Sequence, residues 1–441
     1  MSLPKYPAYK DSGMEWFRNI PQHWEVWKLA HAFDYIGSGT TPKSENAEYY
    51  SDGDVFWLNT GDLNDGELFS CNKKISNLAL LEHSALRIYP ADSLAIAMYG
   101  ATIGKLALLK FETTVNQACC VFGSSEIIRI EFLFYLLLGF RERIISLAIG
   151  GGQPNINQDI LRSLKFPCPI LDEQSLIVTF LDRETAKIDE LIAEQEKLIT
   201  LLEDKRKAMI SHAVTKGLNP DAPMKDSGVE WLGEVPEHWD VRPLKNLVKM
   251  KSGGTPSKEN LAFWDGEIPW ASAKDLKVEK LLDTQDHITN LALEFGNAEL
   301  LPKGSILVVV RGMILAKTFP VVEILVPMAI NQDLKGLYSN LLLKNEFLAY
   351  LLKGSSKESL SRLDEAGHGT KALRMDKWTS MKLPVPPLDE QSAITFYLDQ
   401  KTFQLDNLKI EAQRGIDLFK ERRSALISAA VTGKIDVRGL V

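Results

Sequence analysis

The chain has 441 residues, enough for two domains of ordinary size plus connectors, each able to bury its own core. Its hydrophobic content of 45% and charged content of 25% are typical of a globular protein. The net charge of -7 at pH 7 argues against a free-standing nucleic-acid binder, whose affinity comes mostly from neutralising phosphates. Any nucleic-acid contact must therefore be a local patch, or be shared with a partner.

The sequence carries no sign of secretion, of a zinc site or of a membrane span. The four cysteines include no C-x-x-C pair, which favours a reduced cytoplasmic compartment. Residues 1–11 are polar and lack the basic start and apolar run of a signal peptide. The most apolar stretches, residues 131–140 and 306–330, are too short or are interrupted by charges. We therefore expect a cytoplasmic protein.

Three motifs occur twice, about 215 residues apart, always in the same order. Because a solenoid repeat is only about 20–50 residues long, this period indicates a duplicated two-part module instead. The order along the chain is domain, helix, domain, helix. The motifs are Lys-Asp-Ser-Gly-x-Glu-Trp at residues 10–16 and 225–231, Pro-x-His-Trp at 21–24 and 236–239, and Leu-Asp-Glu-Gln-Ser at 171–175 and 388–392.

Each globular part is predicted to be a mixed α+β domain. Short apolar runs bounded by Gly, Asp and Asn predict buried strands, and longer apolar runs predict core helices. The same order of strands and helix occurs in both halves. The predicted strands are residues 55–58, 94–98 and 106–109 in the first half and 268–271 and 305–310 in the second; the predicted helices are residues 131–147 and 345–353.

The two long helical segments have the clearest periodicity. Apolar residues recur at alternating steps of three and four, so two stripes of matched length could bury each other as an antiparallel pair. The alternative is that each amphipathic helix packs on its own domain. About 40 residues make a helix of about 60 Å, longer than such a domain is wide, which favours the pair. The predicted pairing residues are Ile177, Leu181, Ile188, Leu191, Leu198, Leu202 and Met209, and Ile394, Leu398, Leu405, Leu408, Phe419 and Leu426.

We therefore predict an α+β fold with two mixed α/β domains held apart by an antiparallel pair of long helices, a coiled coil with pseudo-two-fold symmetry from the duplication. The predicted boundaries are residues 1–170 for the first domain, 171–217 for the first helix, 218–387 for the second domain and 388–441 for the second helix.

Catalytic signatures are missing from the sequence. Residues 100–105, Gly-Ala-Thr-Ile-Gly-Lys, are one residue short of a phosphate-binding loop, and no Asn-Pro-Pro-aromatic tetrapeptide is present. A nuclease-like Glu-x-Lys fragment at residues 203–205 lies in a predicted helix, where a solvated face is the favoured interpretation. The sequence has no His-x-x-x-His pair, so a hydrolytic metal site is not indicated. A non-catalytic protein is therefore expected.

Loops rich in small, amide and basic residues recur at equivalent places and are candidates for binding nucleic acid. Ser-Gly-Thr-Thr-Pro and Ser-Gly-Gly-Thr-Pro, each near a lysine, offer N–H groups and hydroxyls to a phosphate, although such segments are more often simple turns. Asn-Gln pairs can contact adenine, but can equally hydrogen-bond within a turn. Glycine loops at residues 150–155 and 367–371 could approach DNA closely. The candidates are Ser38, Gly39, Thr40, Lys43, Tyr99, Thr102, Lys105, Asn116, Gln117, Gln153 and Asn155, and Ser252, Gly253, Thr255, Lys258, Arg311, Lys317, Asn331, Gln332, His368, Thr370 and Lys371.

The repeated motifs, the loops and the order of domains and helices together resemble the specificity subunit of type I restriction-modification systems, over essentially the whole chain. The resemblance implies two target-recognition domains, each reading one half of a bipartite, asymmetric site in double-stranded DNA. It implies helices that set the spacer and dock two methyltransferase subunits, with restriction and translocase subunits joining for cleavage. S-adenosylmethionine would then belong to the methyltransferase partner, and this chain would bind neither cofactor nor metal.

The two halves differ in their candidate loops. Residues 311–317 replace the Gly-Lys form of residues 100–105, and residues 368–371 replace residues 151–154. A framework that repeats with loops that differ predicts two different half-sites. Three alternatives remain: a specificity subunit of a methylation-only or other bipartite-site system, a coiled-coil scaffold that binds only proteins, and a fused methyltransferase, for which the sequence offers no cofactor loop.

Overall fold

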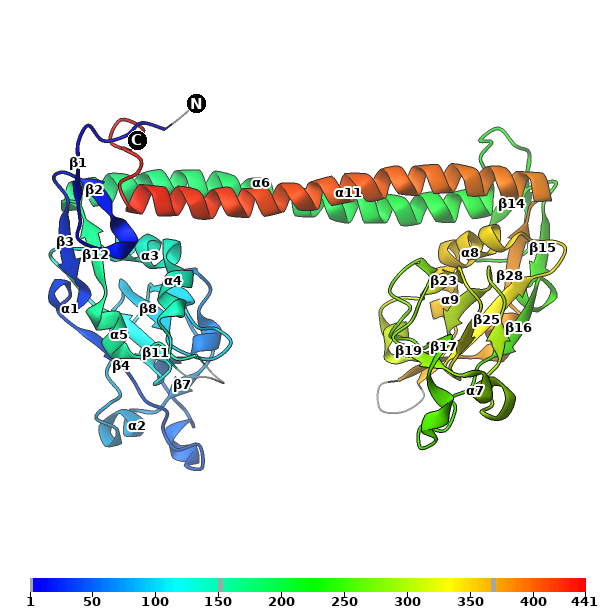
Figure 1. Ribbon diagram of the computed structural model, residues 1–441, viewed down its shortest axis with the longest axis horizontal. Helices are drawn as coiled ribbons and strands as arrows, with labels where there is room; N and C mark the ends of the chain where they lie inside the picture. The colour runs from blue at the N-terminus through cyan, green and yellow to red at the C-terminus, as the bar shows by residue number, and fades with distance from the viewer. Residues whose placement is uncertain (1–2, 150–153, 366–369) are drawn as a thin grey trace. The chain divides into compact units, whose positions relative to one another are not determined.

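The computed structural model describes residues 3–149, 154–365 and 370–441 (Figure 1). The chain divides into two compact units: unit 1 comprises Met1–Gln195 and Arg414–Val441, and unit 2 comprises Glu196–Gln413. The long helices α6 (Leu171–Lys216) and α11 (Leu388–Val431) each begin in one unit and end in the other. No helix in the described ranges is long and apolar enough to cross a membrane.

Unit 1 is built around a five-stranded sheet in the order β4-β11-β8-β9-β6. Only β6 is parallel to its neighbour; the other pairs are antiparallel. Side chains of β8 alternate between two apolar layers, with Leu94 and Ile96 facing the α3 side and Ala95 and Ala97 facing the other. Burial on both faces explains why these strands are continuous apolar runs. Their bounds are β4 (Ile36–Ser38), β6 (Gly66–Leu68), β8 (Ser93–Ala97), β9 (Leu106–Leu109), β11 (Cys119–Phe122) and α3 (Ile130–Gly139).

A smaller sheet, in the order β10-β5-β7, carries the short helix α2 in unit 1. Trp57 of this sheet is 4% exposed and packs with Ile75 and Ala79, so it is a core residue. The bounds are β5 (Val55–Leu58), β7 (Lys74–Ile75), β10 (Thr114–Val115) and α2 (Asn77–Glu82).

Unit 2 repeats this architecture. Its five-stranded sheet has the order β16-β25-β21-β23-β18, and a second sheet has the order β19-β17-β24-β20. Helix α8 packs on the larger sheet as α3 does in unit 1. The bounds are β16 (Val248–Ser252), β17 (Trp264–Ala271), β18 (Lys280–Leu281), β19 (Asp286–Ile288), β20 (Leu300–Leu301), β21 (Ile306–Val309), β23 (Val321–Ile324), β24 (Met328–Ile330), β25 (Leu334–Ser339) and α8 (Asn345–Gly354).

The predicted strands and the helix at residues 345–353 are confirmed, but the single helix predicted at residues 131–147 is wrong. The segment forms two helices, α3 and α4 (Arg141–Ser146), separated by Phe140 at φ -116° and ψ 13°. The break turns Phe140 into the core, where its ring centroid lies 4.5 Å from that of Phe17. A Cβ on Gly139 would lie 3.2 Å from Ile427, so the glycine also allows α11 to pass closely.

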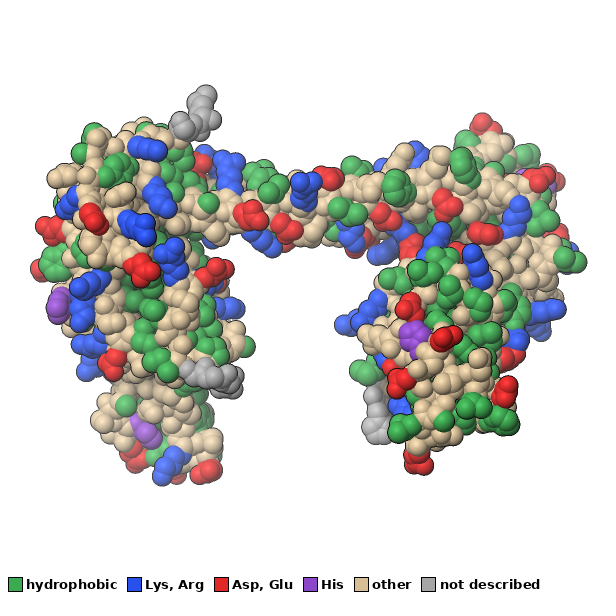
Figure 2. Space-filling model, viewed as in Figure 1, with side chains coloured by type: hydrophobic (Ala, Val, Ile, Leu, Met, Phe, Trp, Pro, Cys, Tyr) green, Lys and Arg blue, Asp and Glu red, His purple; other side chains and the backbone are tan. Residues whose placement is uncertain are grey.

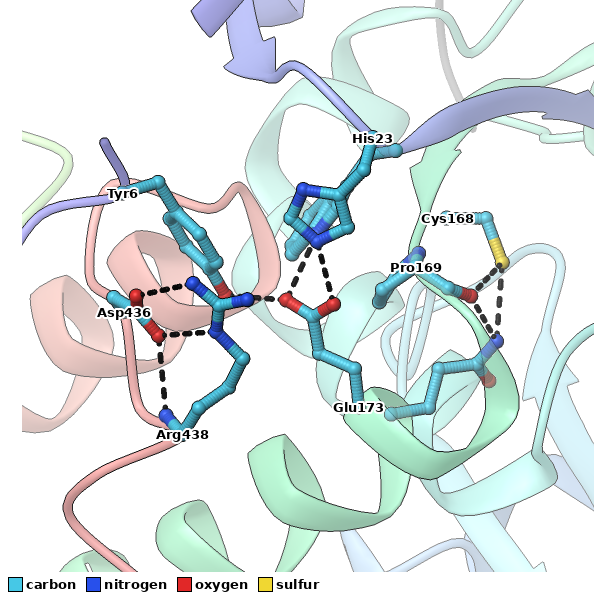
Figure 3. A network of polar contacts seen from close by, with 9 residues as sticks. Tyr6, His23, Cys168, Pro169, Glu173, Asp436 and Arg438 are labelled. Atoms are coloured by element: carbon cyan, nitrogen blue, oxygen red, sulfur yellow. Dashed lines mark hydrogen bonds and ion pairs between the residues drawn. The ribbon is translucent and has the colours of Figure 1, made fainter. Parts of the chain in front are cut away.

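The start of α6 is anchored by a buried carboxylate, that of Glu173 (Figure 3). It accepts hydrogen bonds from the Tyr6 hydroxyl at 2.7 Å and from Trp24 Nε1 at 3.0 Å, and His23 Nε2 lies 2.7 Å from its second oxygen. In unit 2, Glu390 holds His238 and Trp239 in the same way, at 2.8 and 2.9 Å. The Leu-Asp-Glu-Gln and Pro-x-His-Trp motifs therefore recur together because they are bonding partners.

The glutamine of the same motif joins the helix to the domain. The Gln174 side chain donates to the carbonyls of Ile127 and Pro169, both at 2.8 Å, and accepts from the Arg129 N–H at 2.8 Å. Gln391 makes the equivalent bonds to Leu342, Pro386 and Lys344, also at 2.8 Å. Both amides are fully buried, so these bonds satisfy backbone groups that water cannot reach.

A tyrosine from each domain helix also contacts the long helices. The Tyr135 hydroxyl donates to Asp182 at 2.6 Å, and the Tyr350 hydroxyl donates to Asp399 at 2.7 Å. Burial raises the pKa of both phenols, and the neighbouring carboxylates raise it further. The two hydroxyls therefore stay protonated and remain donors.

The long helices run antiparallel. In unit 2, Glu203 of α6 pairs with Lys409 of α11, and three residues further along α6, Arg206 pairs with Asp406, 3.4 Å from Nε to Oδ1. In unit 1, Arg423 Nε lies 2.9 Å from Asp189 Oδ1. Asp406 and Arg423 each lie 217 positions after Asp189 and Arg206, so the same ion pair occurs once in each unit.

The buried stripe on each helix corrects part of the predicted one. Leu191, Leu198 and Leu408 are 44%, 41% and 55% exposed, so the stripe does not pass through them. It passes through residues one position further on, which include Ile192, Ile199 and polar side chains that an apolar pattern omits. The stripe on α6 is Leu181, Thr185, Ile188, Ile192, Gln195, Ile199, Leu202, Arg206, Ile210 and Ala213, and the stripe on α11 consists of the residues 217 positions later. The other predicted positions are buried or half-buried: Ile177, Leu181, Ile188, Leu202, Met209, Ile394, Leu398, Leu405, Phe419 and Leu426.

Removing the Glu173 carboxylate is expected to destabilise the protein. Glu173→Ala leaves the buried Trp24 and Tyr6 donors without an acceptor, so we expect a loss of about 2–4 kcal/mol in the free energy of unfolding. The Glu173 side chain is 5% exposed and that of Glu390 is 27% exposed. Glu390→Ala, the matched variant, should therefore cost about half as much, because water can replace the acceptor. Urea denaturation of both variants measures the difference; equal losses would contradict it.

The corrected stripe is tested by two neighbouring truncations. Ile188 is 4% exposed, so Ile188→Ala should lower the free energy of unfolding by about 2–4 kcal/mol. Leu191 is 44% exposed, and Leu191→Ala should cost less than about 1 kcal/mol. Denaturant titration of the two variants is the measurement, and a larger loss for Leu191→Ala would restore the stripe predicted from the sequence.

Candidate nucleic-acid interface

Two of the predicted loops of unit 1 lie against each other. The Ser-Gly-Thr-Thr-Pro turn follows β4 and meets the Asn-Gln turn that follows β10, and Thr41 Oγ1 donates to Gln117 Oε1 at 2.6 Å. The Trp57 indole donates to the Thr40 carbonyl at 3.2 Å and so fixes the turn to the core. A Cβ on Gly39 would lie 1.7 Å from the Val115 carbonyl oxygen, so only glycine allows this approach.

Within the Asn-Gln pair the two amides have different environments. Asn116 Oδ1 accepts from the Ala118 N–H at 3.1 Å, and its Nδ2 donates to Asn59 at 3.2 Å. Gln117 is exposed, and its side-chain nitrogen has no hydrogen-bond partner in the described part of the chain. The geometry therefore favours the turn interpretation for Asn116 and leaves Gln117 available to a ligand.

Unit 2 repeats this arrangement. Thr255 Oγ1 donates to Gln332 Oε1 at 2.5 Å, and the Trp270 indole donates to the Gly254 carbonyl at 3.0 Å. Asn331 is 8% exposed and accepts from the Asp333 N–H at 3.1 Å, so it also serves the turn. A Cβ on Gly253 would lie 2.0 Å from the Ile330 carbonyl oxygen.

The contact between the other two candidate loops differs between the units. In unit 1, Tyr99 and Asn155 form a backbone bridge, which brings the loop of Thr102 and Lys105 beside the end of the glycine loop. In unit 2 the corresponding contact is a strand pair, β22 (Arg311–Gly312) with β27 (Lys371–Leu373). Thr370 directly precedes β27. Gln153 and His368 lie outside the described residues.

The candidate cations also differ in what holds them. Arg311 is paired with Asp333 at 2.8 Å, and Lys371 is paired with Glu365 at 2.5 Å. Among the residues with a described position, Lys43, Lys105, Lys258 and Lys317 have no ion-pair partner. Ser252 accepts from Lys335, and the Ser38 carbonyl accepts from Tyr89 at 2.9 Å, so both are held within the fold. The four free lysines are the cations most available to phosphates.

Sequence reasoning missed Thr41. The composition of the loop predicts Thr40 as a contact. In the structure it is Thr41 that bonds Gln117, as Thr255 bonds Gln332 in unit 2. Both threonines directly precede a proline, Pro42 and Pro256, so an alignment on the Thr-Pro dipeptide reveals the equivalence.

Cysteine and metal chemistry are not supported by the described residues. Burial raises the pKa of the Cys120 thiol to about 12 and also raises those of Cys119 and Cys168, so these thiols stay protonated. In the part of the chain that the structure describes, no group of three or more His, Cys, Asp or Glu side chains could hold a metal ion.

The different roles of the two amides can be separated by stability. Asn116→Ala removes both turn bonds and should lower the free energy of unfolding by about 1–2 kcal/mol. Gln117→Ala changes only an exposed side chain and should stay within about 0.5 kcal/mol of the parent. Thermal or urea unfolding measures both, and a neutral Asn116→Ala would show that the amide is not needed for the turn.

Comparison with known proteins places these two units in one family. The family model described as "Type I restriction modification DNA specificity domain" matches residues 21–201 and again residues 236–416. The specificity subunit of the Escherichia coli type I restriction enzyme EcoR124I/EcoR124II is 32% identical over 247 residues, 54% of this chain and 55% of that protein, so that match spans about half its length. The MjaVIII specificity subunit of Methanocaldococcus jannaschii is 25% identical over 438 residues, 96% of this chain and 95% of that protein.

Solved structures agree on the fold. A chain from a type I R-M system superposes with a TM-score of 0.72 at 16% identity, over 93% of this chain and 98% of that one. The HsdS subunit from Thermoanaerobacter tengcongensis gives 0.54 at 17% identity, over 94% and 98%. With the family model matched in both units, the chain belongs to the family of type I restriction-modification specificity subunits. The family match confirms the prediction of a specificity subunit rather than a catalytic one.

Proposed function

We propose that each unit reads one half of a bipartite, asymmetric DNA site, with Gln117 and Gln332 among the side chains that contact bases. The observation that carries this proposal is the repeated turn: in each unit an exposed glutamine is held by a threonine hydroxyl, and no described residue accepts a hydrogen bond from its amide nitrogen. A glutamine side chain can make a bidentate contact to adenine in the major groove. Lys105 and Lys317, which have no ion-pair partner among the described residues, bind phosphate.

The long helices set the distance between the half-sites and dock two methyltransferase subunits, and restriction and translocase subunits join the complex for cleavage. Two observations support partner subunits that dock on this chain and share the DNA interface with it. The chain has a net charge of -7, so a partner must supply much of the positive charge that DNA binding needs. The paired helices also carry exposed apolar side chains, including Phe396 and Phe403, each 66% exposed. S-adenosylmethionine is bound by the methyltransferase partner, and the complex acts in the cytoplasm.

The test is a methylation map. The chain is co-expressed with its methyltransferase partner, and methylated adenines are located by sequencing. We expect a bipartite site; methylation at one short continuous site would contradict the proposal. A methylation-only system gives the same map without cleavage when the remaining subunits are added, and a scaffold that binds only proteins gives no methylation pattern that depends on this chain.

Single-residue variants then assign the contacts. Gln117→Ala and Gln332→Ala should each relax one position, in different halves of the site, at a cost of about 1–3 kcal/mol. Lys105→Ala and Lys317→Ala should instead weaken binding to all sequences alike and reduce its salt dependence. Binding titrations at two salt concentrations measure both effects. If the two glutamine variants alter the same half, the assignment of one unit to each half-site is wrong.

A further inference from the structure

A cavity of about 590 Å³ lies in unit 1, away from the candidate DNA-reading turns. Its walls come from the N-terminal strands β1 (Tyr9–Asp11) and β2 (Asn19–Pro21), from α4 and from the end of α11. In Figure 1 the strands β1 and β2 lie beside the long helices, whereas β4, which leads into the Ser-Gly-Thr-Thr-Pro turn, lies toward the other end of the unit.

The cavity gathers four basic side chains: Lys5, Arg18, Arg143 and Lys434. Within the described ranges none of the four has an ion-pair partner, and one acidic side chain, Glu15, lines the same cavity. Figure 2 shows Lys and Arg side chains gathered over this part of unit 1. A chain with a net charge of -7 thus concentrates unpaired positive charge around one hollow.

The fold itself does not need these cations. The second copy has Gly233 at the place of Arg18 and Glu358 at the place of Arg143, 215 positions later in each case, and it forms the same strand and helix. Unpaired like charges that are close together repel each other, so they are kept at some cost in stability. Their presence in unit 1 alone therefore indicates a ligand rather than a framework role.

We propose that this cavity binds a small polyphosphate. Two guanidinium groups can each bind phosphate oxygens in a bidentate manner, and two lysines add charge around them. The volume is within the range of small-molecule sites and is too large for a single phosphate. Trp16, half-buried in the wall, offers an aromatic face on which the base of a nucleotide can stack.

The test is calorimetric titration of the full chain with sodium tripolyphosphate and with ATP at low salt. The key variant is R18G/R143E, which carries the residues of the second copy and so respects the fold. A matched control, R87G/R422E, makes the same change in net charge at exposed arginines outside the cavity. We expect R18G/R143E to weaken tripolyphosphate binding by at least about tenfold, and the control to change it by less than about twofold.

If ATP binds more tightly than tripolyphosphate and Trp16→Leu removes that difference, the ligand is a nucleotide. If the two bind equally, the ligand is the polyphosphate group alone. The proposal is overturned if the parent chain binds neither probe, or if both double variants lose binding equally. It is also overturned if R18G/R143E weakens only duplex DNA, because the cavity would then be a DNA backbone contact. The methylation map of R18G/R143E should match that of the parent, so failure here is distinct from failure of the DNA-reading role.

Discussion

The structure depends on one hydrogen-bond acceptor in each unit, the glutamate at the start of each long helix, which is buried in unit 1 and half-buried in unit 2. A carboxylate can lie in a protein core only when its hydrogen-bond capacity is filled. Glu173 meets this condition with Tyr6, His23 and Trp24, which all come from the beginning of the chain. One interaction therefore joins a helix that begins at Leu171 to a segment about 150 residues earlier, and fixes where the helix leaves its domain.

The arrangement of the helices follows from the same duplication. Because the stripe repeats after 217 residues, each side chain of the seam in one unit has its counterpart in the other, including an arginine and an aspartate that pair across the two helices. Partly buried charges contribute little net stability on their own. They do penalise other registers, because a shift of the helices would separate Arg206 from Asp406 and Arg423 from Asp189.

Much of the fold could be predicted from the sequence, because the physical signal was local. Runs such as residues 106–109 are continuous and apolar between turn residues, and they are strands. The break at Phe140 could not be predicted, because it depends on the contact with Phe17 and on the approach of Ile427, both distant in sequence. The stripe was misplaced at Leu191 because neighbouring helix positions, Leu191 and Ile192, are both apolar and only packing distinguishes them.

The candidate site, like the fold, could be predicted only in part from the sequence. The sequence identified the Asn-Gln pairs and the turns that they contact, since composition and repetition are visible there. It could not separate Asn116 from Gln117, because the direction of a side chain is set by the turn around it. It also gave no reason to treat Arg18 and Arg143 together, since they are brought to one cavity only by the packing of α4 against the N-terminal strands.

The ion pair between Arg311 and Asp333 makes the candidate DNA-contacting loops of the two units unequal before any DNA binds. In unit 2 this ion pair joins the loop after β21 to the Asn-Gln turn, whose Asn331 also contacts Asp333. In unit 1 the residue that follows the Asn-Gln turn is Ala118, which offers no carboxylate. The second unit has therefore already lost conformational entropy that the first still has to lose on binding. Recognition of the two half-sites should accordingly differ in its balance of enthalpy and entropy, even where the affinities are alike.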